Sequence, residues 1–254
     1  EYDNEKRIRS GIKYALLRAT YNGHCTVLYD NLVYFTKDLL GVSEDAIDNS
    51  LINMKAKEEI YIEERNSGDW IYLATYYKAE KNIAEKLIAL RDYRNINGVE
   101  NLDRKLKKIE KEQKIELSDK QKEAVKLVND NNVCIITGGP GTGKTTIIKS
   151  IIDMYNAEEL KVTLCAPTGR AAKRMTEATG EEAKTLHRVL EIGKFASEDE
   201  INPDLLVTPI DANIVIVDEA SMIDLFLMNY LMKALYDGTK LVLVGDENQL
   251  PSVG

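Results

Sequence analysis

Short runs of apolar residues alternate with amphipathic stretches over the second half of the chain. The runs are apolar throughout, which is typical of strands buried on both faces of a parallel sheet. They lie at 133–136, 162–165, 214–217 and 241–244. Stretches with helical spacing separate them. This alternation predicts a doubly wound α/β domain, in which helices cover both faces of a parallel sheet.

The apolar spacing over residues 1–94 predicts a small helical domain. Apolar residues recur at helical intervals in three stretches, at 8–16, 32–39 and 47–54. We expect Asp30 and Ser43 to cap the second and third helices, and Gly41 to end the second. The turn residues 66–69 separate two strand-like runs and predict a hairpin. Three helices followed by a hairpin are typical of a winged-helix domain.

The third helix of a winged-helix domain often binds DNA, but its surface here is acidic. Several acids lie on this helix and at its exit: Glu44, Asp45, Asp48, Glu58 and Glu59. Only Lys55 and Lys57 oppose them. Such a surface repels DNA phosphates, so we expect the helix to pack against protein rather than to read DNA.

Residues 95–116 are predicted to form a linker helix between two domains. Charged residues dominate this stretch, and large apolar residues recur at helical spacing only at Leu102, Leu106 and Ile109. The predicted domains are therefore the winged-helix-like domain 1–94 and the α/β domain 117–254.

Composition narrows the class of protein. Apolar residues make up 44% of the chain, and the net charge of −8 argues against nucleic-acid binding through bulk positive charge. Three widely spaced cysteines indicate neither a disulfide framework nor a zinc site, so we expect a reducing, cytoplasmic location. No apolar run approaches the ~18 residues of a membrane helix, so no membrane contact is expected. The chain begins with Glu1 and stops at Gly254 soon after a strand-like run, which suggests a piece of a longer protein.

Residues 138–145 read Gly-Gly-Pro-Gly-Thr-Gly-Lys-Thr and stand between a predicted strand and a predicted helix. This spacing matches the phosphate-binding loop G-x-x-x-x-G-K-[ST]. Glycines let backbone N–H groups turn toward the phosphates, and the helix N-terminus favours the anion. We expect Lys144 to contact the β- and γ-phosphates and Thr145 to bind Mg²⁺. The predicted nucleotide-binding residues of this loop are Gly139, Pro140, Gly141, Thr142, Gly143, Lys144, Thr145 and Thr146.

Two adjacent acids, Asp218 and Glu219, follow the apolar run 214–217. Acids at a strand end downstream of a phosphate loop match the Walker B pattern. We expect the chain to turn both side chains toward the loop where the strand ends. Asp218 would then hold Mg²⁺ through water, and Glu219 would orient and deprotonate the attacking water.

Further motifs give the chain a family resemblance. Residues 218–222 (Asp-Glu-Ala-Ser-Met) and 245–254 (Gly-Asp-Glu-Asn-Gln-Leu-Pro-Ser-Val-Gly) resemble motifs II and III of superfamily 1 helicases. Their spelling is similar to the RecD-type branch, the exodeoxyribonuclease V alpha-chain-like helicases. Residues 168–174 resemble motif Ia of that branch, 184–188 its motif Ib, and 117–121 the Q motif that reads adenine. The resemblance covers the whole chain and ends at motif III.

The resemblance implies a RecA-like motor domain of an ATP-dependent 5′→3′ DNA helicase, with ATP and Mg²⁺ as cofactors. Gln121 is the implied adenine contact, and Gln249 is the implied γ-phosphate sensor. The expected catalytic residues are Lys144, Asp218, Glu219 and Gln249. Single-stranded DNA or a duplex junction is the implied partner, together with subunits of a recombination or repair complex. The expected contacts to DNA backbone phosphates are Pro167, Thr168, Arg170, Thr185 and His187.

Two further features of the family are a small inserted hairpin and a set of arginines that complete the ATPase site. A small strand-separating hairpin is inserted in the family near 191–210, where Phe195 is the candidate for stacking on a base. That segment is short and acidic here, which puts a working pin in doubt. The arginines that complete the ATPase site come from motifs after motif III, so residues 1–254 alone are expected to be inactive.

The alternative function is a P-loop switch or clamp that binds nucleotide and regulates a partner protein without translocating. No N-K-x-D base motif is present, which argues against a GTPase form of that switch. The loop with Gln249 favours the helicase.

Overall fold

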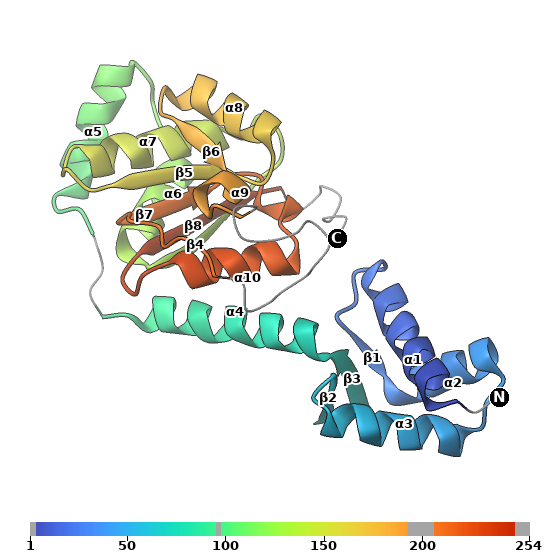
Figure 1. The fold of residues 1–254 in the computed structure, drawn as a ribbon. Coiled ribbons are helices and arrows are strands. Elements are labelled where there is room, and N and C mark those ends of the chain that lie inside the picture. The colour runs from blue at the N-terminus through green and yellow to red at the C-terminus, as the bar shows by residue number, and fades with distance from the viewer. Residues whose placement is uncertain (1–3, 95–97, 193–205, 247–254) are drawn as a thin grey trace. The chain divides into compact units, whose positions relative to one another are not determined.

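The computed structural model describes residues 4–94, 98–192 and 206–246, and these form two compact units (Figure 1). The first unit extends to Lys81, and the second begins at Asn82. Helix α4 (Ala74–Asp92) contributes residues to both. The border therefore lies at residues 81–82, rather than at the predicted residue 94. The structure assigns the second half of α4 to the second unit because Ile83, Leu87 and Leu90 pack in its core.

The first unit consists of three helices and a small antiparallel sheet. The helices are α1 (Glu5–Thr20), α2 (Tyr29–Leu40) and α3 (Glu44–Ala56). The strands β1 (Thr26–Leu28), β2 (Ile60–Arg65) and β3 (Gly68–Leu73) pair in the order β1-β3-β2. The predicted apolar stripes close one core, in which Ile12, Ile47 and Ile71 are fully buried. This is the predicted arrangement of three helices and a hairpin, with β1 as an element that was not predicted.

The helix ends confirm two of the three caps predicted for this unit. The Ser43 hydroxyl accepts a hydrogen bond from the Ala46 N–H at 3.3 Å. Gly41 ends α2 in the left-handed conformation, with φ of 66°. The prediction for Asp30 is wrong, because Leu28 occupies the N-cap and Asp30 lies in the first turn. A carboxylate in the first turn still stabilises the helix through its dipole.

Two of the acids on and after α3, Asp48 and Glu59, are engaged within the first unit. Asp48 accepts a hydrogen bond from the Tyr29 hydroxyl, and this bond raises the pKa of Tyr29 to about 12. Glu59 accepts a hydrogen bond from Arg9 at 2.6 Å and forms an ion pair with Lys13 at 3.0 Å. These contacts support the packing role expected for this helix.

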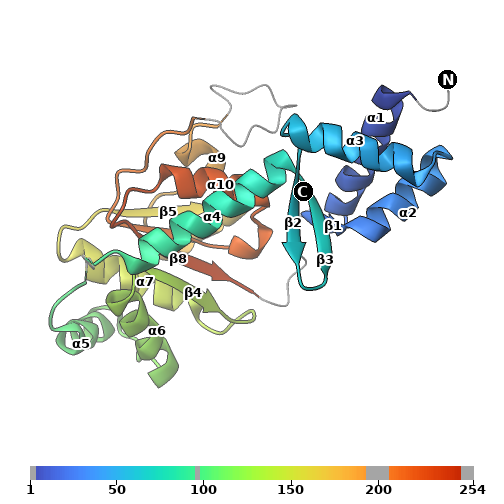
Figure 2. The ribbon, with the colours of Figure 1, turned by 90° about the horizontal axis from the view of Figure 1, so that it is seen from below.

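The second unit is a parallel sheet with helices on both faces (Figures 1 and 2). Its strands are β4 (Val133–Thr137), β5 (Val162–Ala166), β6 (Ala183–Thr185), β7 (Ile214–Val217) and β8 (Lys240–Gly245). Every pair is parallel, in the order β4-β8-β7-β5-β6. The predicted apolar runs form four of the strands, and β6 was not predicted. The α/β fold class is confirmed.

Alternate residues of the buried strands face two different cores. Ile214 and Ile216 of β7 pack with α5 (Leu102–Gln113), α6 (Asp119–Asp130) and α7 (Lys144–Asn156). Val215 and Val217 face the opposite core, built with α9 (Leu186–Val189), α10 (Leu225–Ala234) and the end of α4. In Figure 1, α10 lies on one side of the sheet, and α5 and α7 lie on the other.

Helix α5 lies within the stretch 95–116 that was predicted as a linker. Leu106 and Ile109 are buried in the core that α5 shares with α7, and Lys105 forms an ion pair with Glu158. The helix predicted from the spacing of its apolar residues is therefore confirmed. The structure nevertheless places this helix inside the second unit, because these residues have a core to fill there.

None of the helices in the described residues is both long enough and apolar enough to cross a membrane.

Lys240, the first residue of β8, is fully buried. Its ammonium group donates to the carbonyls of Val128 (2.6 Å), Asn129 (3.0 Å) and Asn131 (2.6 Å). The last carbonyls of a helix have no partner within the helix, and a cation is favourable there. Burial lowers the pKa of Lys240 to about 8. This lysine therefore caps the C-terminal end of α6 and ties that helix to the sheet.

We expect Lys240→Met to lower the free energy of unfolding by about 2–4 kcal/mol, because it would leave buried carbonyls without a donor. Lys161→Met is the matched control, since Lys161 pairs with Asp211 at an exposed position. The control should change stability by less than about 1 kcal/mol. Urea unfolding of both variants measures the difference, and equal effects would show that the capping contacts contribute little.

Candidate nucleotide-binding site

The carboxyl ends of the parallel strands bring most of the predicted site residues to one edge of the second unit. The loop 138–143 follows β4, and the acids Asp218 and Glu219 follow β7. The predicted DNA contacts follow β5 and β6. Ligands of open α/β sheets bind at this edge.

The loop between β4 and α7 combines left-handed glycines with an inward-lying lysine. Gly141 and Gly143 have φ of 76° and 85°, a left-handed conformation that favours glycine. The Thr142 hydroxyl donates to the Gly139 carbonyl at 2.8 Å. The Lys144 ammonium donates to the carbonyls of Gly138 and, at 3.0 Å, Gly139. The lysine therefore lies across the loop at the N-terminus of α7.

Gln121, in the first turn of α6, contacts this loop. Its Oε1 accepts a hydrogen bond from the Ser118 N–H at 2.9 Å, as part of a capping box. Its Nε2 lies beside Gly143, where an added Cβ would come within 2.2 Å of it. Only glycine leaves this space free. The structure thus brings Gln121 to the loop 138–143, with its amide NH₂ group against Gly143.

Asp218 and Glu219 leave β7 through a left-handed turn. Glu219 has φ of 54°, which is uncommon for a residue with a side chain and often marks a functional site. Asp218 Oδ1 accepts a hydrogen bond from the Glu219 N–H at 2.9 Å. Burial raises the pKa of Asp218, while the charges of Lys144 and Arg174 counteract part of the rise.

Arg174, on α8 (Gly169–Thr179), forms an ion pair with Glu219. The Nη2–Oε1 distance is 2.8 Å, and the side chains of Arg174 and Glu219 are 63% and 17% exposed. Arg174 is not among the predicted site residues. Its spacing of four residues from Arg170, which places both arginines on one face of the helix, is the sequence signal that points to it.

The predicted DNA contacts lie on two neighbouring strand ends: Pro167, Thr168, Arg170, Thr185 and His187. Thr168 caps α8 and Thr185 caps α9, and each hydroxyl accepts a backbone N–H at 3.2 Å. A Cβ added at Gly169 would lie 4.0 Å from Thr185 Cγ2, so the two caps are close together. Each hydroxyl keeps its own proton as a donor. Arg170 and His187 are exposed.

Gln249 and Phe195, the predicted phosphate sensor and stacking residue, lie outside the described residues. Most of the candidate pin 191–210 also lies outside them. The strand that leads toward Gln249, β8, pairs with β4, and Gly245 stands opposite Thr137. The strand that leads toward Gln249 therefore lies next to the strand that leads into the loop 138–143.

The chemistry of the site suits a Mg²⁺ ion that is shared with a nucleotide. Within the described ranges, no group of three His, Cys, Asp or Glu side chains is placed to hold a metal. Mg²⁺ is usually bound through one or two protein ligands together with substrate phosphates. Thr145, exposed in the first turn of α7, and Asp218 fit that role.

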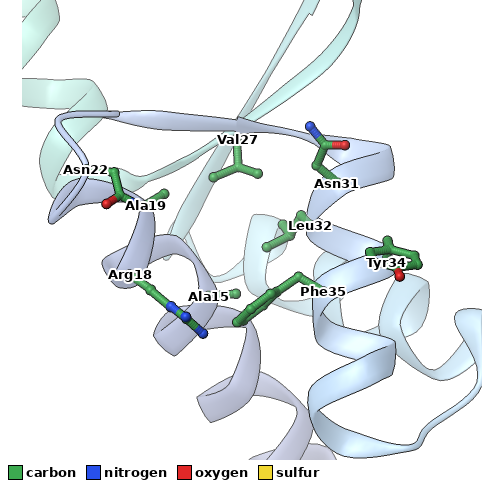
Figure 3. Close-up of a pocket in the computed structure, with 9 residues that line it drawn as sticks. All are labelled: Ala15, Arg18, Ala19, Asn22, Val27, Asn31, Leu32, Tyr34 and Phe35. Atoms are coloured by element: carbon green, nitrogen blue, oxygen red, sulfur yellow. The ribbon is translucent and has the colours of Figure 1, made fainter.

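A separate pocket of about 420 Å³ lies between α1 and α2 in the first unit (Figure 3). Its lining is mostly apolar, and Arg18 and Phe35 point toward one another across it. The Arg18 guanidinium carbon lies 5.2 Å from the centre of the Phe35 ring. None of the residues predicted to bind nucleotide or DNA lines this pocket.

Comparison with known proteins tests the family resemblance of the chain. Residues 121–254 match the family model of the AAA domain. Over 99% of its length, the chain is 31% identical to the ATP-dependent RecD2 DNA helicase of Deinococcus radiodurans, of which it covers 35%. Over 73% of its length, it is 38% identical to the RecBCD enzyme subunit RecD of Buchnera aphidicola subsp. Schizaphis graminum, of which it covers 33%. The chain belongs to the RecD-type superfamily 1 helicases.

The family resemblance predicted from the motifs is thereby confirmed. This RecD-type chain spans about a third of the length of the curated relatives it matches. A crystal structure of the Pif1 helicase from Candida albicans is also similar, at 24% identity and a TM-score of 0.42, over 55% of this chain and 34% of that one. The region that matches the AAA domain, residues 121–254, includes the parallel sheet of the second unit.

We expect Gly143→Ala to destabilise the RecD-type motor domain by about 1–3 kcal/mol, because alanine is strained at this φ and its methyl group would displace Gln121. Gly139→Ala is the matched control in the same loop, since nothing lies within 4 Å of a Cβ added there. The control should stay within about 0.5 kcal/mol of the original protein. Thermal unfolding of both variants provides the measurement. Equal midpoints would contradict the contact between Gln121 and Gly143.

Proposed function

We propose that this chain is the first motor domain, with a preceding winged-helix-like domain, of an ATP-dependent 5′→3′ DNA helicase. The observation that carries the proposal is the shared strand edge of the second unit. A glycine loop with Lys144 and the acids after β7 lie there beside two threonine-capped helix N-termini. The name of the D. radiodurans relative, an ATP-dependent RecD2 DNA helicase, supports ATP and DNA as ligands.

The loop 138–145 is the proposed phosphate site. Lys144 donates to carbonyls of its own loop, and the oxygens of bound ATP would replace these acceptors. A hydrogen bond between two charged groups is stronger than one to a neutral carbonyl, so the exchange favours binding. Gln121 lies at the same loop and would present its NH₂ group to the adenine. Thr145 and Asp218 would hold Mg²⁺, which neutralises phosphate charge when bound.

Glu219 is the proposed general base for the attacking water. Because its backbone is left-handed, the Glu219 side chain points in a different direction from one that continued the strand β7. A positioned carboxylate takes up the proton of the water as the bond to the γ-phosphate forms. Gln249, in the motif III sequence after β8, is the proposed sensor of the γ-phosphate.

The ends of β5 and β6 are the proposed track for the DNA backbone. The Thr168 and Thr185 hydroxyls, the exposed Arg170 and His187, and the backbone at Pro167 can donate to or pack against phosphates without reading bases. The N-terminus of α8 also favours anions. These local groups account for DNA binding by a chain with a net charge of −8. The RecBCD subunit names of several relatives support a recombination or repair complex as a partner.

ATP turnover by the full-length protein, with and without single-stranded DNA, tests this function. A helicase motor should hydrolyse ATP faster when DNA is present. It should also unwind a duplex with a 5′ single-stranded tail in preference to one with a 3′ tail. Nucleotide binding without any DNA-dependent turnover would contradict the helicase and indicate a nucleotide-dependent switch that acts on a partner protein.

Glu219→Gln should keep Mg·ATP binding and slow hydrolysis by roughly 10² to 10⁴, the usual effect of losing a general base. The amide retains the size of the side chain but cannot accept the proton. Calorimetry with a non-hydrolysable ATP analogue checks binding, and single-turnover phosphate release checks the chemical step. Hydrolysis at the original rate would show that another group is the base.

A further inference from the structure

One ion pair joins the helix of the proposed DNA track to the proposed base. Arg174 Nη2 lies 2.8 Å from Glu219 Oε1. Arg170, a proposed DNA contact, lies one turn earlier on the same face of α8. Arg174 therefore links the helix that carries the proposed DNA contact Arg170 to the proposed base Glu219.

We propose that Arg174 is a positioning residue that restrains Glu219 until single-stranded DNA binds. Without DNA, the guanidinium holds one carboxylate oxygen of the base. A phosphate of bound DNA offers the guanidinium a competing acceptor, and Glu219 is then free to orient the attacking water. This inference rests on the proposed function, and it specifies how DNA regulates the ATPase site.

The exposure of the two side chains fits such an exchange. Arg174 is 63% exposed and can be reached by a phosphate from solvent, whereas Glu219 is only 17% exposed. The opposite face of α8 is anchored by the buried Ala171, Ala172 and Met175. The helix therefore stays in place while the long arginine side chain changes its partner.

The backbone around Glu219 also allows its side chain to move alone. The Glu219 N–H donates to Asp218 Oδ1 at 2.9 Å, and the Glu219 carbonyl accepts the Met222 N–H at 3.1 Å. These bonds hold the left-handed turn on both sides of the residue. Release of the carboxylate from Arg174 then requires only a rotation of the side chain, without any change of the strained backbone.

The neighbouring cation on α8 provides a matched control. Lys173 has a side chain that is 79% exposed, and it lies 3.9 Å from Glu177 on the same helix. Lys173→Ala removes the same charge from the same helix without touching the ion pair of Glu219. It separates the effect of this contact from a general loss of positive charge near the DNA.

The test measures ATP hydrolysis by the full-length protein and its Arg174→Ala and Lys173→Ala variants, without DNA and with saturating oligo(dT). Without DNA, Arg174→Ala should hydrolyse ATP about two- to fivefold faster than the original protein, the scale set by an exposed ion pair. The gain should appear in kcat, with KM for ATP unchanged, because Arg174 contacts the base and not the phosphate loop. Stimulation by DNA should fall by the same factor.

Arg174→Lys, which keeps a cation, should restore part of the restraint, and Lys173→Ala should leave both rates within about twofold of the original. A slower or unchanged DNA-free rate in Arg174→Ala would overturn the restraint. An equal gain in Lys173→Ala would overturn it as well. If the original protein itself shows no stimulation by DNA, the proposed helicase function fails. If the original protein is stimulated normally and Arg174→Ala behaves like it, only the proposed restraint fails.

Discussion

The parallel direction of every strand in the second unit is the constraint on which the rest of its chemistry depends. Because the carboxyl ends share one edge, segments far apart in the sequence meet there: the loop after β4, the acids after β7 and the helix caps after β5 and β6. The strand order places β7 next to β5, so the acids lie beside the proposed DNA track. The proposed coupling between hydrolysis and DNA would then need only one long side chain, that of Arg174.

Elements with a strong local pattern could be predicted from the sequence, and elements formed by tertiary pairing could not. The apolar runs predicted β4, β5, β7 and β8 because a strand buried on both faces must be apolar throughout. Strands β1 and β6 are three residues each, too short to show a period, and they exist through pairing with β3 and β5. For α5, the apolar spacing predicts the helix, but it does not predict which core the helix packs against.

The same division holds within the candidate site. The phosphate loop and the acids after β7 could be placed at one edge because their positions follow from strands and from a known loop spacing. The pairs Arg174–Glu219 and Gln121–Gly143 could not be predicted, because each depends on how a long side chain lies against a distant element. Lys240 is a similar case. Its sequence position at the start of an apolar run carries no sign that its ammonium group caps α6.

Hydrogen–deuterium exchange with and without a Mg²⁺ complex of a slowly hydrolysed ATP analogue tests the central claim most directly. The claim is that the edge of the parallel sheet, and not the pocket of the first unit, holds the nucleotide. The account predicts slower exchange in 138–146, where backbone N–H groups would donate to phosphates, and in 218–222. Residues 15–35 should be unaffected. Protection of 15–35 without protection of 138–146 would contradict the account.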